Sequence, residues 1–185
     1  MRIIGGKFRG LKLAEVGSGD PDAHLRPTTD RVRETMFNLL INSLGIRLEG
    51  TRVLDLFAGT GALGLEALSR GAARVAFVDD GAASRALLRT NIEKARAMGT
   101  TDVWRRDATR LGPNRGAGYD LIFMDPPYGK SLGEVALQSA IDGNWLAPDA
   151  VLVWEDSALP ALPEGFDLLD QRRYGETHVT ILQRR

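Results

Sequence analysis

From Arg52 to Trp154 the chain alternates short apolar runs with segments of helical pattern, and this alternation constrains its fold more than any other feature. We expect strands and helices in the order 53–57, 62–70 (helix), 74–78, 82–98 (helix), 102–106, 119–124, 132–141 (helix) and 151–154. Short connections between alternating strands and helices predict an α/β fold of the Rossmann-like type, with a mostly parallel sheet covered by helices on both faces. Residues 171–174 and 177–182 flank Gly175-Glu176, which predicts an antiparallel hairpin at one edge.

The first 48 residues precede this alternation, and we expect them to form an N-terminal extension to a domain that spans residues 49–185. Residues 2–13 have the pattern of a short β-hairpin, and residues 17–24 that of a loop to which we assign no role. A helix should begin near Asp30 behind a threonine cap, because a negative charge in the first turn suits the helix dipole.

The N-terminal extension is locally basic although the whole chain has a formal net charge of zero. Residues 1–13 contain four basic side chains and no acidic one, and three arginines follow. We predict an RNA-contacting face, because such a face can bind phosphates even on a neutral protein. A merely solvated charged surface is the alternative. The predicted contact residues are Arg2, Lys7, Arg9, Lys12, Arg26, Arg31 and Arg33.

Composition excludes several other classes of protein. The chain has 185 residues, 43% of them apolar and 26% charged, which is ordinary for a globular domain. No apolar run is long enough to span a membrane, and the first residues lack the apolar core of a secretory signal. Without cysteine, and with only His24 and His178, we expect no disulfide and no metal site. We expect a monomer in the cytoplasm.

Four acidic residues fall at or near the carboxyl ends of the first four predicted strands. They are Asp55, Asp79, Asp107 and Asp125. Because α/β sheets bind ligands beyond the carboxyl ends of their strands, we expect these side chains on one rim. Four carboxylates there repel one another unless each has a partner, so a role in stability alone explains them poorly.

Residues 59–64 have the pattern Gly-x-Gly-x-x-Gly between a predicted strand and a helix. Such a loop lets a ligand approach the backbone, and it suits either a dinucleotide or S-adenosylmethionine. Asp79 suits ribose hydroxyls in both cases. Asp55 would repel a pyrophosphate but attract an ammonium or sulfonium group, which favours S-adenosylmethionine. There are two alternatives. Asp55 could be a capping or loop-ordering residue, and the protein could be an NAD(P)-dependent oxidoreductase.

Residues 125–128, Asp-Pro-Pro-Tyr, directly follow the apolar run 119–124. Two prolines cannot donate to a sheet, so the strand must stop at a rigid corner. The corner offers a carboxylate, a free carbonyl and an aromatic ring, which suit a planar group with an exocyclic amine. A proline-rich turn with a surface tyrosine is the alternative.

Together, residues 55–61 and 125–128 resemble the cofactor-binding and amino-methylating motifs of class I methyltransferases. Residues 2–10, 26–38, 61–72 and 173–175 narrow the resemblance to the RsmD family of bacterial 16S rRNA guanine-N2 methyltransferases. The resemblance covers nearly the whole chain. It implies a class I methyltransferase sheet, S-adenosyl-L-methionine as cofactor, and 16S rRNA or a small-subunit assembly particle as partner.

The resemblance also implies roles for individual residues. The methionine part of the cofactor would lie against Asp55, Phe57, Gly59, Thr60 and Gly61, its ribose against Asp79, and its adenine against Asp107 and Ala108. The catalytic corner would be Asp125, Pro126, Pro127 and Tyr128, with the carboxylate and the Pro126 carbonyl accepting from the guanine N2 amine and the tyrosine stacked on the base.

The chemistry implied is a direct displacement, in which two acceptors orient the lone pair of the amine toward the methyl group. The base must be unpaired or flipped to reach the corner. An adenine-N6 methyltransferase acting on DNA or RNA remains an alternative, because the same corner serves both bases. A non-catalytic RNA-binding module is a further alternative.

Overall fold

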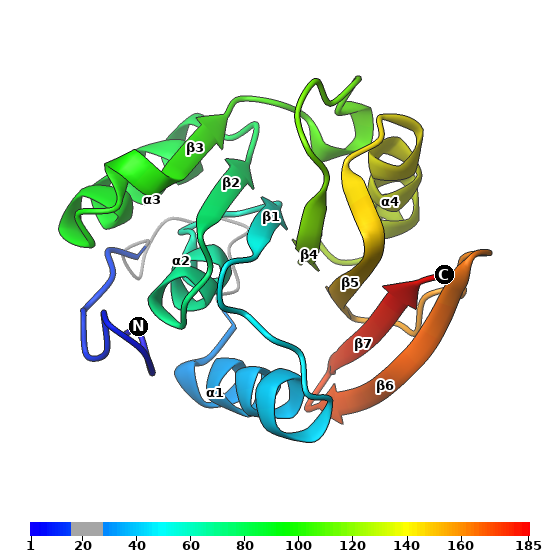
Figure 1. Cartoon of the computed structure of the whole chain (residues 1–185), viewed down its shortest axis with the longest axis horizontal. Coiled ribbons are helices and arrows are strands. Elements are labelled where there is room, and N and C mark those ends of the chain that lie inside the picture. The colour runs from blue at the N-terminus through cyan, green and yellow to red at the C-terminus, as the bar shows by residue number, and fades with distance from the viewer. Residues whose placement is uncertain (16–27) are drawn as a thin grey trace.

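The computed structural model describes residues 1–15 and 28–185, and in this part of the chain seven strands form one sheet. Their order is β3-β2-β1-β4-β5-β7-β6, which Figure 1 shows running across the molecule. The first five strands are parallel, and the last two form an antiparallel hairpin whose β7 pairs with β5. The predicted sheet and its edge hairpin are therefore confirmed. The strands are β1 (Arg52–Leu56), β2 (Arg74–Val78), β3 (Thr101–Trp104), β4 (Tyr119–Met124), β5 (Leu146–Asp156), β6 (Phe166–Tyr174) and β7 (Thr177–Arg184).

Helices cover both faces of the sheet. One face packs against α1 (Asp30–Asn38), α2 (Ala62–Ser69) and α3 (Ala82–Lys94), through a core that includes Phe37, Leu65 and Phe123. The other face packs against α4 (Leu132–Asp142) and a short 3-10 turn at Ala108–Arg110. A π-helical turn, Leu39–Ser43, continues α1, and a second 3-10 turn lies at Met98–Thr100. Alternate residues of each strand point to opposite faces, so both cores are built from the same apolar runs.

Several element boundaries differ from the expected ones. Helix α3 ends at Lys94 rather than near residue 98, because Arg96 adopts a left-handed backbone conformation with φ of 52°. The third strand ends at Trp104, two residues earlier than expected. Strand β5 is much longer than the predicted 151–154, since Leu146 pairs with Tyr119 and the polar end of β5 pairs with β7. Apolar runs mark the buried centre of a strand but miss its paired polar ends.

The hairpin predicted for residues 2–13 is confirmed, although its paired part is short. Arg2 and Lys12 form an antiparallel bridge, and the Ile3 and Leu13 N–H groups donate to the carbonyls of Leu11 and Met1 at 3.0 Å each. The turn between the two arms also bonds to α2. The peptide N–H groups of Ile4 and Gly5 donate to the carboxylate of Glu66 at 2.9 and 3.0 Å. Ile3 and Leu13 are buried in the same core as Val53 of β1. The N-terminal segment, residues 1–15, thus packs directly on the sheet-and-helix core.

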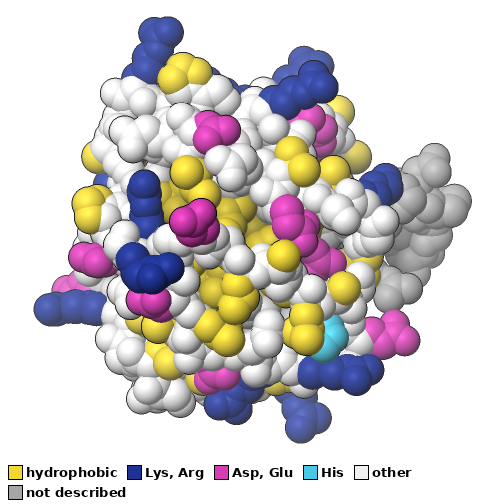
Figure 2. All heavy atoms as spheres, turned by 90° about the vertical axis from the view of Figure 1, so that its right-hand side faces the viewer, with side chains coloured by type: hydrophobic (Ala, Val, Ile, Leu, Met, Phe, Trp, Pro, Cys, Tyr) yellow, Lys and Arg dark blue, Asp and Glu magenta, His cyan; other side chains and the backbone are white. Residues whose placement is uncertain are grey.

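Figure 2 shows the side of the molecule that lies at the right of Figure 1, near α4, β6 and β7. Hydrophobic side chains gather in the middle of this face, while Lys and Arg side chains lie mainly toward its outline. Across the described residues, no helix is both long and apolar enough to cross a membrane.

Candidate active site

The rim formed by the carboxyl ends of β1, β2 and β4 carries most of the predicted site residues. From β1 the chain continues through β2 and β3 on one side, and then returns to β4 and β5 on the other. The switch in strand order therefore falls between β1 and β4, where open α/β sheets bind ligands. Asp55 lies on β1 opposite Phe123 of β4, and Asp125 follows two residues after Phe123. The two carboxylates therefore stand on opposite sides of the switch.

Asp55 is almost completely buried beside this switch in strand order, with 2% of its surface exposed. One of its oxygens accepts a hydrogen bond of 3.0 Å from the peptide N–H of Gly64, in the first turn of α2. Burial raises the pKa of Asp55 well above its usual value, and the nearby carboxylates of Asp79 and Glu155 raise it further. Asp55 therefore caps the start of α2, which is one of the alternatives considered for it, and this contact occupies one carboxylate oxygen.

The loop after β1 has a strained backbone. Phe57 adopts φ of 58°, a left-handed conformation that is an outlier for a bulky side chain. Such strain costs about 1–3 kcal/mol and concentrates at functional sites. Gly61 also has a positive φ, and a Cβ atom there would lie 2.3 Å from the Leu88 side chain. The sharp turn brings the peptide groups of residues 57–61 to the rim.

Asp79, directly after β2, holds the glycine loop in place. One of its oxygens accepts from the Gly59 N–H at 2.9 Å and the other from the Gly81 N–H at 2.8 Å. Burial raises the pKa of Asp79 despite these two bonds, and the charge of Asp80 adds to the shift. A carboxylate oxygen can accept more than one hydrogen bond, so each oxygen of Asp79 could accept a further bond from a ligand hydroxyl.

Asn91 of α3 connects the glycine loop to the N-terminal segment, a connection that the sequence did not indicate. Its side-chain amide donates to the carbonyl of Thr60 at 2.9 Å and to that of Ala14 at 3.0 Å, and its oxygen accepts from the Ala14 N–H at 2.6 Å. Asn91 is fully buried. A buried asparagine in a helix needs such partners, but the sequence does not say which ones.

Asp107 and Ala108 lie beyond β3. Asp107 is exposed and caps the 3-10 turn, with one oxygen, Oδ1, accepting from both the N–H and the hydroxyl of Thr109 at 2.9 and 2.6 Å. These bonds hold the pKa of Asp107 below its usual value. Both bonds fall on one oxygen, so the other can accept from a ligand. Ala108 is buried against α4 and packs in the core of that face.

The corner after β4 has the geometry that its two prolines predict. Pro126 is buried, Pro127 is exposed and Tyr128 is half-buried. The Tyr128 hydroxyl is 2.8 Å from the Thr177 hydroxyl at the start of β7, which fixes one edge of the ring. Burial raises the pKa of Asp125 well above its usual value, and Glu155, Asp55 and Asp156 raise it further.

Glu155, near the end of β5, belongs to the same group of carboxylates and was missed in the sequence. It is 2% exposed, and its Oε2 accepts from the Thr28 hydroxyl at 2.9 Å. Burial raises its pKa to about 7, while the Thr28 hydrogen bond and the charge of Arg33 act in the opposite direction. The signal was available, because Glu155 follows the apolar run 151–154 as Asp125 follows 119–124.

The predicted RNA-contacting residues fall into three groups. The side chains of Arg2, Lys7, Arg9, Lys12 and Arg31 are exposed, and Arg26 lies outside the described residues.

The prediction that Arg33 contacts RNA is wrong, because its side chain is fully buried. Its guanidinium bonds to Glu66 of α2 at 3.1 Å, to Asp30 at 3.0 Å and to the carbonyl of Arg2. Arg33 therefore joins α1, α2 and the N-terminal segment inside the core. Nothing in the sequence indicated this burial, because the partner that compensates the charge, Glu66, is 33 residues away along the chain.

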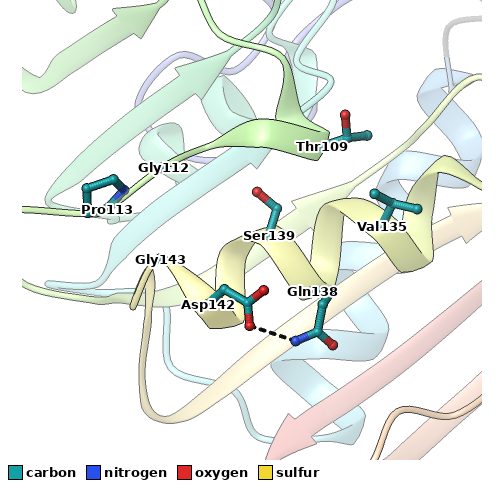
Figure 3. Close-up of a pocket in the computed structure, with 8 residues that line it drawn as sticks. All are labelled: Thr109, Gly112, Pro113, Val135, Gln138, Ser139, Asp142 and Gly143. Carbon is teal, nitrogen blue, oxygen red and sulfur yellow. Dashed lines mark hydrogen bonds between the residues drawn. The ribbon is translucent and has the colours of Figure 1, made fainter.

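A hollow of about 420 Å³ lies apart from the rim, between the turn after β3 and α4, and Figure 3 shows its lining. Asp142 and Gln138 of α4 line it and point toward each other, with a hydrogen bond of 2.8 Å between them. Thr109 is its nearest link to the predicted site, next to Ala108 in the chain. We place the chemistry on the rim instead, because that is where the strained loop and the carboxylates meet. Within residues 1–15 and 28–185, no group of three or more His, Cys, Asp or Glu side chains is arranged to hold a metal ion.

Comparison with known proteins shows which family the chain resembles. The model of the family described as conserved hypothetical protein 95 matches residues 1–183. The chain is 38% identical over its full length to ribosomal RNA small subunit methyltransferase D of Escherichia coli K12, covering 90% of that protein. It is 34% identical to the protein of the same name from Haemophilus influenzae, with 99% of this chain and 93% of the relative covered.

The fold is also shared with solved structures. The structure of an Escherichia coli protein proposed to be a methyltransferase superposes with a TM-score of 0.85. That protein is 36% identical to this chain, and the match covers 100% of this chain and 98% of the other.

Proposed function

Because the chain belongs to the RsmD family, we propose that it methylates RNA of the small ribosomal subunit, at the exocyclic N2 amine of one guanine, with S-adenosylmethionine as methyl donor. The observation that carries the proposal is the corner at residues 125–128. It stands across the switch in strand order from the glycine loop, so a base at the corner faces a cofactor in that loop. The names of the relatives support RNA as the substrate.

The residues of the rim fit S-adenosylmethionine. The ligand is a net cation at neutral pH, and the rim contains several carboxylates that raise the pKa values of one another. Arg85 is the cation that acts on Asp79, where it partly offsets the rise in pKa. Asp79 has acceptor capacity for the ribose hydroxyls, and Asp107 has an oxygen for the adenine amine. The strained turn at Phe57, Gly59 and Gly61 would place the backbone beside the methionine part, with the N–H groups of Gly59 and Gly61 already bonded within the protein. A pyrophosphate in place of the methionine would meet Asp55, which disfavours a dinucleotide.

When bound, S-adenosylmethionine supplies a methyl group on a positively charged sulfur, which keeps the bonding electrons as the new C–N bond forms and the amine releases one proton. The protein orients the amine. Asp125 and the carbonyl of Pro126 accept its two hydrogens, and this directs the nitrogen lone pair toward the methyl group. Tyr128 supports the base through its ring, which the Thr177 hydroxyl holds in position. Asp125 then accepts the proton as positive charge develops on nitrogen.

The RNA would approach over the N-terminal segment and α1. Arg2, Lys7, Arg9, Lys12 and Arg31 present their charges to solvent there, and this supports contact with phosphates. The Asn91 bonds to Ala14 and Thr60 connect this surface to the glycine loop. We expect the protein to act as a monomer in the cytoplasm, on 16S rRNA or on a particle that contains it.

The test is methyl transfer by the purified protein from radiolabelled S-adenosylmethionine to small-subunit particles and to free 16S rRNA, followed by nucleoside analysis. We expect label only in N2-methylguanosine. The Asp125→Asn variant should lose transfer by about 10²-fold or more while it still binds the cofactor, since its amide cannot accept the proton. Label in N6-methyladenosine, or full activity of Asp125→Asn, would contradict the proposal.

A further inference from the structure

Glu155 and Asp125 are neighbours on adjacent parallel strands. Met124 of β4 pairs with Trp154 of β5, so the residues that follow them stand side by side. Neighbouring strands are about 4.8 Å apart, and side chains at equivalent positions point to the same face. Both carboxyl groups therefore face the α1 side of the sheet, together with Phe123 and Val153. Strand pairing brings them together although 29 residues separate them in the sequence (125 to 155).

Only one of the two carboxylate oxygens of Glu155 has a hydrogen-bond partner among the described residues. Its Oε2 accepts from the Thr28 hydroxyl, while its Oε1 is buried and has no hydrogen-bond partner among the described residues. Burying an ionised carboxylate with an unpaired oxygen is costly, and a proton held between two carboxyl groups removes that cost. The mechanism proposed above uses Asp125 and leaves Glu155 without a role.

The other charged groups around the pair do not neutralise it. Asp55 of β1 and Asp156 of β5 add negative charge, and the Tyr128 phenol borders the corner. The cation that acts on Glu155 is Arg33 of α1, whose guanidinium already bonds to Glu66 and Asp30. On the β7 side, His178 pairs in the ladder with Asp156. Burial raises the pKa of both Asp125 and Glu155. Among the neighbouring charges, that of Glu155 raises the pKa of Asp125 the most.

We propose that Glu155 is a positioning residue that shares one proton with Asp125 and so sets the protonation state in which Asp125 meets the substrate amine. This inference rests on the proposed methyl transfer. The pair begins the step with its negative charge on Asp125, so that the amine hydrogens have an acceptor. As the C–N bond forms and the S–C bond breaks, the proton of the amine passes to the pair, and it leaves to water after the product departs.

The test is a titration of the free protein, followed by ¹³C NMR of its Asp and Glu carboxyl groups. In the native protein we expect Asp125 and Glu155 to titrate in two coupled steps. In Glu155→Gln, which keeps an acceptor for Thr28, Asp125 should titrate in one step with its midpoint lower by roughly one unit or more. Asp156→Asn, which removes a weaker neighbouring charge, should lower the midpoint by less. An unchanged Asp125 midpoint in Glu155→Gln would overturn the proposal.

A reciprocal variant covers the case in which Glu155→Gln does not fold. In Asp125→Asn, the midpoint of Glu155 should fall below its native value of about 7, and an unchanged midpoint would overturn the pairing. The acidic limb of the rate of methyl transfer to RNA should also move to lower pH in Glu155→Gln, and a fixed limb would refute the positioning role. Because the titrations need no substrate, shifted midpoints with no methylation of RNA would refute the proposed function alone.

Discussion

At the scale of residues, the most unusual property of this protein is a set of carboxyl groups whose proton affinity is raised by burial. Asp55, Asp79, Asp125 and Glu155 all have pKa values above the usual range, with burial as the largest cause. Near neutral pH these carboxyl groups therefore bind more protons than ordinary carboxylates would. A net cation in the crevice favours the ionised forms, so its binding should release protons.

We predict that S-adenosylmethionine binds more tightly as pH rises from 6 to 8, by about tenfold if roughly half a proton is released per ligand. S-Adenosylhomocysteine, with an uncharged sulfur, should show a weaker dependence. Calorimetric titration in two buffers of different ionisation enthalpy measures the released protons directly. An equal pH dependence of the two ligands would contradict the prediction.

The same shifts set the pH dependence of folding. A carboxyl group whose pKa is raised in the folded state contributes stability below its unfolded pKa and loses that contribution as pH rises through the folded pKa. For Glu155 the contribution is complete below about pH 4.5 and is lost as the pH passes about 7. Without a ligand, ionisation of these buried carboxyl groups thus destabilises the folded protein at alkaline pH, where cofactor binding is expected to be strongest.

The positions of residues could be predicted from the sequence where strand direction decides the outcome. Asp55 and Asp125 could be placed on the same rim because parallel strands end at one edge of a sheet. Glu155 was missed because it continues a strand that is paired with β7 beyond the apolar run. Asn91 was missed because its partners, Ala14 and Thr60, come from two other segments.

At the scale of elements, a buried ion network joins the N-terminal segment, α1 and α2. Glu66 accepts from Arg33 and Arg70 at 3.1 Å each, and from the peptide groups of Ile4 and Gly5. Glu66 and Arg33 are both fully buried. Removing one member of such a network leaves an uncompensated buried charge, which is far more harmful than losing a surface ion pair.

We therefore predict that Arg33→Met lowers the free energy of unfolding by about 3 kcal/mol. Arg31→Met is the matched control, since Arg31 lies two residues away on the same helix but is exposed. It should change stability by less than about 0.5 kcal/mol and should instead weaken RNA binding and reduce its salt dependence. Urea unfolding and salt-dependent RNA titration separate the two effects. Equal stability of the two variants would refute the network.

The elements themselves were largely predictable. Periodicity located the strands and α2, α3 and α4, because the buried faces of these elements leave a regular apolar pattern. The end of α3 was not predictable, since the first strong breaker after it is Gly99 and the helix stops earlier at a left-handed Arg96. The N-terminal hairpin was predictable from its local pattern. Its bonds to the Glu66 side chain of α2 were not, because such long-range partners leave no local pattern.

At the scale of the whole molecule, the sheet collects the site from segments that are distant in sequence. Beyond β1 and β2 stand the glycine loop and Asp79, beyond β4 the corner at residues 125–128, and the β6–β7 hairpin holds Tyr128 through Thr177. The N-terminal segment lies on the same core and bonds to the glycine loop through Asn91. The residues proposed for RNA contact, cofactor binding and methyl transfer thus belong to one continuous body, as the proposed function requires.

The most direct test of the central claim is a nucleoside and position map of small-subunit rRNA from cells that lack this protein. We predict the loss of one N2-methylguanosine, its return when the native protein is supplied, and no return with Asp125→Asn supplied at equal abundance. An rRNA map that is unchanged by the deletion, or one that loses only N6-methyladenosine, would contradict the account.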